Sequence, residues 1–167
     1  MAATGLNTTT TSSDGRIEAK LRAEQVVKAA ASWFLVVAGL SIVNSIVTLS
    51  GGSFHFIFGL GITQIVDAMG KLSGSVGSAL SLVVNLFVAG VFALFWHFAR
   101  QGKKWAFLTG MALYALDGLI LLPFSDWLGA AFHAYALFRM YQGLQGLSAL
   151  QGIHRSLPSS PAPIEPA

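Results

Sequence analysis

Cysteine is absent from the 167-residue sequence. Its absence excludes disulfides, thiol redox chemistry and sites in which cysteine holds a metal ion or an iron–sulfur cluster. Charge is also scarce: Asp, Glu, Lys and Arg make up 10% of the chain, against about 25% in soluble domains. Motifs of catalysis, phosphate binding or metal binding are missing as well. The scarcity of charge supports a membrane protein, and the missing motifs do not favour an enzyme.

Hydrophobic residues make up 54% of the chain and gather in four long apolar stretches, at 29–49, 78–98, 105–123 and 127–147. Each is close to the about 20 residues that an α-helix needs to cross about 30 Å of hydrocarbon. We therefore expect an all-α, polytopic membrane protein whose four-transmembrane-helix bundle occupies residues 16–150. The Thr- and Ser-rich segment 1–15 is expected to be a disordered N-terminal tail, and the Pro-rich segment 151–167 a cytoplasmic tail.

Lysines and arginines are distributed unevenly between the two sides of this bundle. Cytoplasmic loops carry the excess of basic residues in membrane proteins, so the richer side should be cytoplasmic. The long loop 50–77, on the other side, carries only Lys71. We expect cytoplasmic N- and C-termini, and the net charge of +3 then requires no nucleic-acid partner. The basic residues on the inner side are Arg16, Lys20, Arg22, Lys28, Arg100, Lys103, Lys104 and Arg155.

The loop 50–77 contains its own helical pattern. Apolar side chains recur at the i, i+3, i+4, i+7 spacing, which is typical of an amphipathic helix; they are Ile62, Ile65, Val66 and Met69. A helix of about three turns is too short to span, so we expect it between the first two spans, where it lies in the outer interface or caps the bundle. The alternative is a re-entrant segment over 54–72, because the residues before the stripe are also apolar.

Each expected span carries one polar side chain at a similar depth in the outer leaflet: Asn44, Asn85, Asp117 and His133. A turn centred near residue 125 places Asp117 opposite His133 in an antiparallel hairpin. An ionisable residue inside a membrane is a functional candidate by default. The structural alternative is a hydrogen bond from Asp117 to His133 or Tyr114 that joins two helices. Both interpretations stay open, and no residue is assigned as catalytic.

Arg139 is the second costly group, twelve residues or about 18 Å from the outer end of the fourth span. Its long side chain can reach toward the cytoplasmic headgroups, or it can pair with Asp117 across a depth difference of about 9 Å. Arg139 belongs to a stripe along one face of the span, formed by Tyr135, Arg139, Gln142 and Gly146. Such a stripe is consistent with polar contacts between helices or with a subunit contact.

Histidines do not suggest a cofactor. His97 lies at the inner end of the second span, about 20 Å in depth from His133, so the two cannot ligate one haem iron. We expect neither a cofactor nor a metal site.

The segment 105–143 resembles a pattern in small bacterial four-helix integral membrane proteins of unassigned function. The residues that carry the resemblance are Gly110, Tyr114, Asp117, Asp126, Trp127, His133 and Arg139. The resemblance implies a multi-pass protein of the bacterial inner membrane, and it implies no activity.

Two function classes fit these patterns. The first is a non-enzymatic accessory or structural subunit, embedded in the lipid bilayer as a homo-oligomer or within a larger membrane complex. The second is a small-solute or proton pathway, or a lipophilic-ligand site, built on the polar layer in the outer leaflet.

Overall fold

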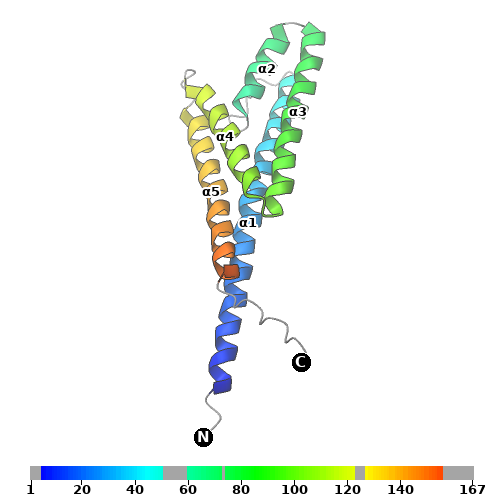
Figure 1. Ribbon diagram of the computed structural model, residues 1–167. Helices are drawn as coiled ribbons and strands as arrows, with labels where there is room; N and C mark the ends of the chain where they lie inside the picture. Colours follow the sequence, from blue (N-terminus) through cyan, green and yellow to red (C-terminus); the bar gives the residue numbers. More distant parts are fainter. Residues whose placement is uncertain (1–4, 51–59, 73, 123–126, 156–167) are drawn as a thin grey trace, which may run out of the picture.

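The computed structural model describes residues 5–50, 60–72, 74–122 and 127–155. Within these ranges all regular secondary structure is helical, as the sequence predicts. The helices are α1 (Gly5–Leu49), α2 (Gly61–Leu72), α3 (Gly74–Arg100), α4 (Lys104–Leu121) and α5 (Trp127–Arg155). Figure 1 shows the four long helices packed along one another, with the short α2 lying against the upper part of α3.

Three segments are long and apolar enough to cross a membrane: Asp14–Val47 in α1, Ala79–Arg100 in α3 and Lys104–Leu121 in α4. The expected fourth span, 127–147, is helical within α5, but it is not one of these candidates. Length is not the reason, because α5 has 29 residues. Polar side chains such as His133, Arg139 and Gln142 lower its apolar content. By length and composition the described chain therefore has three candidate spans.

α1 is longer than the first apolar stretch. It runs without a break for 45 residues, so the boundary expected at residue 16 is not an interruption of the helix. Its residues 14–22 are exposed, and the blue N-terminal part of α1 extends past the end of α5 (Figure 1). The C-terminal tail from residue 156 onward and the turn residue Asp126 lie outside the described residues.

The turn between α3 and α4 is tight. Gly102 has a φ of +77°, a left-handed conformation that only glycine adopts readily. The amide of Gly102 donates to the Ala99 carbonyl at 2.9 Å, and the amide of Lys103 donates to the Phe98 carbonyl at 3.2 Å. These bonds satisfy the last carbonyls of α3, and α4 turns back antiparallel to it.

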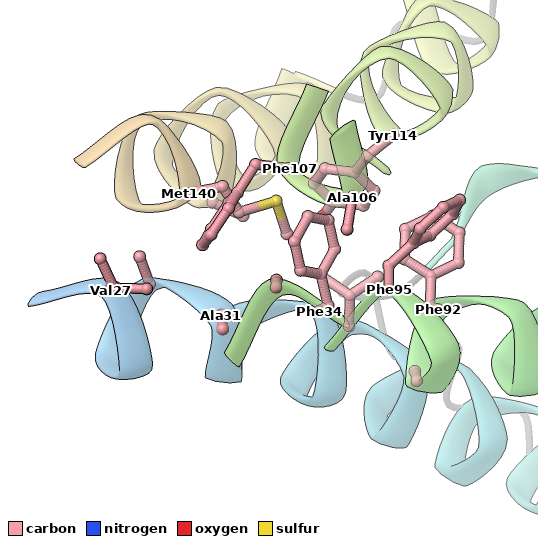
Figure 2. Close-up of a cluster of buried hydrophobic side chains, with 14 of the residues drawn as sticks. Val27, Ala31, Phe34, Phe92, Phe95, Ala106, Phe107, Tyr114 and Met140 are labelled. Atoms are coloured by element: carbon pink, nitrogen blue, oxygen red, sulfur yellow. The ribbon is translucent and has the colours of Figure 1, made fainter. Parts of the chain in front are cut away.

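Aromatic rings fill the centre of the bundle. The fully buried Phe34 of α1 lies 6.3, 6.0 and 5.9 Å, between ring centroids, from Phe92, Phe95 and Phe107. Figure 2 shows Phe34 among side chains of α3 and α4, with the Met140 thioether of α5 nearby. One side chain therefore connects three helices, at the spacing that favours tilted aromatic pairs.

Candidate functional site

Asp117 and His133 form a hydrogen-bonded pair inside the bundle. His133 Nε2 lies 2.9 Å from Asp117 Oδ2, and the two residues are only 5% and 3% exposed. The pair joins α4 to α5, sixteen residues apart in sequence. The hairpin geometry predicted from the sequence is thus what places the two side chains together.

Asp117 also binds the start of α2, an interaction that the sequence does not predict. Its Oδ2 accepts a hydrogen bond from the amide of Gly61 at 2.7 Å, and its Oδ1 accepts one from the amide of Ile62 at 2.8 Å. The first amides of a helix have no acceptor within the helix, and the preceding Leu60 has no polar side chain to supply one. The carboxyl group of an α4 side chain therefore caps α2 by accepting hydrogen bonds from its first amides.

Two hydroxyls complete this cap. Ser41 Oγ, on α1, accepts from the amide of Leu60 at 2.9 Å and donates to the Val37 carbonyl at 3.0 Å. Thr63 Oγ1 donates to the Leu60 carbonyl at 2.7 Å. The start of α2 is consequently bonded to both α1 and α4, and each of these polar groups is buried.

The position of this cap places the start of α2 within the bundle. Ser41 lies eight residues before the end of α1, about 12 Å along the helix, and Asp117 four residues before the end of α4, about 6 Å. Gly61 is needed there, because a Cβ atom on it would lie 2.9 Å from Leu121 Cδ2 and 3.2 Å from the Asp117 carbonyl oxygen. The start of α2 is thus packed inside the bundle between α1 and α4.

Both ring nitrogens of His133 have partners inside the bundle. Its Nδ1 lies 2.9 Å from the Gly129 carbonyl oxygen, which can only accept, so Nδ1 donates there. Its Nε2 faces Asp117 Oδ2. Such hydrogen bonds lower the cost of placing two ionisable groups in an apolar bundle.

Tyr114 belongs to the same site through its ring. Its ring stacks on that of His133, with centroids 4.3 Å apart and an interplanar angle of 16°. Its hydroxyl is buried and has no hydrogen-bond partner among the described residues. The sequence alternative in which Tyr114 hydrogen-bonds Asp117 is therefore not the arrangement observed, whereas the bond to His133 is.

The two asparagines of the expected polar layer lie on other helices. Asn85 Nδ2 on α3 donates to Ser45 Oγ on α1 at 2.7 Å, which joins these two helices. Asn44 is 2% exposed, and its Oδ1 has no hydrogen-bond partner in the described part of the chain. Of the six predicted residues, the structure thus brings three into contact: Asp117, His133 and Tyr114.

Arg139 packs on an aromatic ring. Its guanidinium carbon lies 6.0 Å from the centre of the Trp33 ring on α1, within the range of a cation–π contact. Its Nε is buried without a hydrogen-bond partner among the described residues. The pairing of Arg139 with Asp117 considered from the sequence does not occur in that part of the chain, since the only ion pair of Asp117 there is with His133.

A groove opens beside the start of α2. It has a volume of about 270 Å³ and is lined by apolar side chains of α2, α3 and α4, with Asp117 at its edge. In the ranges that the structure describes, no three His, Asp or Glu side chains stand close enough together to hold a metal ion.

Comparison with known proteins adds no assignment, because no family model, no curated protein and no solved structure matches the chain.

Proposed function

We propose that this protein is a non-enzymatic integral membrane protein that acts as an accessory or structural subunit. The observation that carries the proposal is the saturation of Asp117. Both carboxyl oxygens accept amide hydrogen bonds from α2, and one of them also binds His133. A carboxyl group with this many internal partners serves to hold three helices together, and it has little hydrogen-bonding capacity left for a substrate.

We infer four spans, with α5 as the fourth. His133, which lowers the apolar content of α5 near its start, faces α4 and is hydrogen-bonded to Asp117 inside the bundle. α5 also packs along both α1 and α4. In this arrangement α2 is a re-entrant helix. It starts at the depth of Asp117 and runs back toward the outer end of α3.

An exposed apolar face of α3 supports contact with further subunits. Large apolar side chains repeat there at intervals of three, four or seven residues, and each is more than half exposed: Val76, Leu80, Val83, Phe87 and Leu94. This spacing is that of helices that pack with interlocking side chains. It supports assembly as a homo-oligomer or within a larger complex.

Native mass spectrometry of the protein released from nanodiscs tests the subunit role. We expect a homo-oligomer, or a complex of constant stoichiometry with another membrane protein. A monomer whose thermal stability rises on addition of a small solute would contradict the proposal.

A second candidate function rests on the groove of about 270 Å³ between α2, α3 and α4. Its apolar lining suits a lipophilic ligand. The same mass spectra distinguish the two candidates, since a retained small lipophilic molecule on a monomer would favour the second.

The orientation is open to a direct test with reporter fusions in a bacterial host. We expect cytoplasmic signals from fusions at residues 20, 102 and 160, and a periplasmic signal at residue 64, because Lys71 is the only basic residue of the outer loop. A periplasmic signal at residue 102 would mean that a span has been miscounted.

A further inference from the structure

Arg139 carries a charge that the described chain does not balance. It lies near the middle of α5, in the segment proposed to span the membrane, and its buried Nε has no hydrogen-bond partner among the described residues. Asp117 is already bound to His133 and to two amides of α2, and it makes no ion pair with Arg139 among the described residues. An isolated cation at this depth is costly, so an anion from outside the chain would stabilise it.

The depth of Arg139 points to the inner leaflet. Since residues 117 and 133 face each other in the antiparallel hairpin, Arg139 is level with Met111, seven residues or about 10 Å from the start of α4 at Lys104. The long arginine side chain can extend from there toward the headgroups. Because Arg139 packs on Trp33, its guanidinium group lies against α1.

A groove lies closer to the inner end of α1 and α5. We call it the α1–α5 groove; it lies between residues 19–26 of α1 and 142–149 of α5, with a volume of about 530 Å³. Arg139 is about one helical turn from the lining residue Gln142, and Trp33 is about two turns from the lining residue Val26. Helical spacing therefore puts both on the faces of α5 and α1 that border the groove, just beyond its upper end.

The polar side chains of this groove are hydrogen-bond donors suited to an anion. The α1–α5 groove is lined by Arg22, Gln142 and Gln145, and its described lining contains no carboxylate. Glu18 lies 3.9 Å from Arg22, but both side chains are largely exposed, and such a pair is weak in water. One guanidinium group and two amides thus line the α1–α5 groove, and the guanidinium group of Arg139 lies about one helical turn beyond Gln142 on α5.

We propose that the α1–α5 groove and Arg139 bind an anionic phospholipid of the inner leaflet. The phosphate contacts Arg139 and Gln142, the headgroup occupies the groove, and an acyl chain follows the half-buried Trp33 and the exposed Tyr135. Guanidinium groups bind phosphate through charge-assisted hydrogen bonds, and basic pockets between helices on the cytoplasmic side bind anionic headgroups. The inference rests on the membrane insertion proposed above, and it is independent of the subunit role.

Trp33 supplies a local probe of this site. The protein is prepared with Trp33 as its sole tryptophan, by replacing Trp96, Trp105 and Trp127 with phenylalanine. It is inserted into vesicles in which a minor fraction of the lipid carries brominated acyl chains, as phosphatidylglycerol in one set and as phosphatidylcholine in the other. We expect Trp33 quenching to report an affinity for phosphatidylglycerol about fivefold higher, the factor expected for one arginine near an anionic surface.

Arg139→Gln is expected to abolish this preference, and Lys104→Gln, which removes one cation away from the groove, is expected to preserve it. The ratio between the two lipids cancels any change in Trp33 emission that the loss of the Arg139 contact causes. Should the Arg139 variant fail to fold by circular dichroism, Arg22→Gln, an exposed position on the opposite wall, is expected to reduce the preference in the same way.

Three results would overturn the proposal. Equal quenching by the two lipids in the parent protein would mean that no anionic lipid is preferred at this site. A carboxylate of a partner helix would then be the counter-ion of Arg139. A preference that survives Arg139→Gln would place the lipid elsewhere. An equal loss of the preference in Lys104→Gln would mean that the general positive charge of the inner surface, and not the α1–α5 groove, attracts the anionic lipid. A parent chain that does not insert into vesicles at all would instead contradict the membrane assignment.

Discussion

Replacing Asp117 with leucine is expected to destabilise the protein by about 2–4 kcal/mol, since each buried amide left without an acceptor costs about 1–3 kcal/mol. Two amides, those of Gly61 and Ile62, lose their acceptor in this variant. His133 loses its partner at Nε2 as well. The loss of the cap should act first on α2, whose start is bound to the bundle by these contacts.

Asparagine at position 117 should be intermediate, with a cost of about 1–3 kcal/mol. The amide side chain has the shape of the carboxyl group but only one acceptor oxygen. Whichever way it is oriented, its NH₂ group faces either the amide of Gly61 or the amide of Ile62, so one donor meets another. The contact with His133 alone would have predicted a silent substitution, and the bonds to α2 change this expectation.

Thermal unfolding in mild detergent measures both substitutions at Asp117, with Asp14→Asn as a control because Asp14 is exposed on α1. The order of stability should be wild type and the Asp14 variant, then asparagine at 117, then leucine. A more stable Asp117→Asn variant would point instead to an ionised acid held at a cost for function.

Gly143→Ala is expected to destabilise the protein by about 1–3 kcal/mol through overpacking. A Cβ atom on Gly143 would lie 2.5 Å from Phe107 Cε1 and 2.8 Å from Ala30 Cβ. Neither neighbour can move easily. Phe107 is fully buried against Phe34, and the Cβ atom of the buried Ala30 is fixed directly to the backbone of α1. The helices α1, α4 and α5 would have to separate at their closest approach.

Gly39→Ala is the matched control, since a Cβ atom on Gly39 of α1 meets nothing within 4 Å. Alanine is favoured over glycine within a helix by about 1 kcal/mol, so this variant should be as stable as the wild type or more stable. Chemical or thermal unfolding in detergent, followed by circular dichroism, measures the two variants side by side. If Gly143→Ala is as stable as Gly39→Ala, the packing of α5 on α1 and α4 is looser than the structure indicates.

Periodicity and composition were sufficient to place the helices. The apolar stretches 78–98 and 105–123 fall within or close to α3 and α4, and α5 begins at the expected Trp127. The stripe from Ile62 to Met69 predicts α2 within three residues at each end. These elements follow local spacing, which an individual segment of sequence contains in full.

The contact between Asp117 and His133 was also predictable, because a short turn makes the distance along two antiparallel helices a matter of counting residues. Arg139 was less so. Its cation–π partner Trp33 lies on α1, far away in sequence, and the choice between a lipid-facing position and a pairing with Asp117 depends on how α5 is rotated against α1.

The sequence by itself determined an all-helical chain with apolar segments of membrane-spanning length and a polar pair between its last two helices, since length, hydropathy and turn spacing are local properties. Only the tertiary structure decided what Asp117 holds. Its amide partners lie 56 and 55 residues earlier, and a backbone amide has no side-chain signature that a sequence pattern could reveal. The burial of the α2 start, and with it the structural use of the acid, depends on α1 and α4 packing around a helix end that has no acceptor of its own.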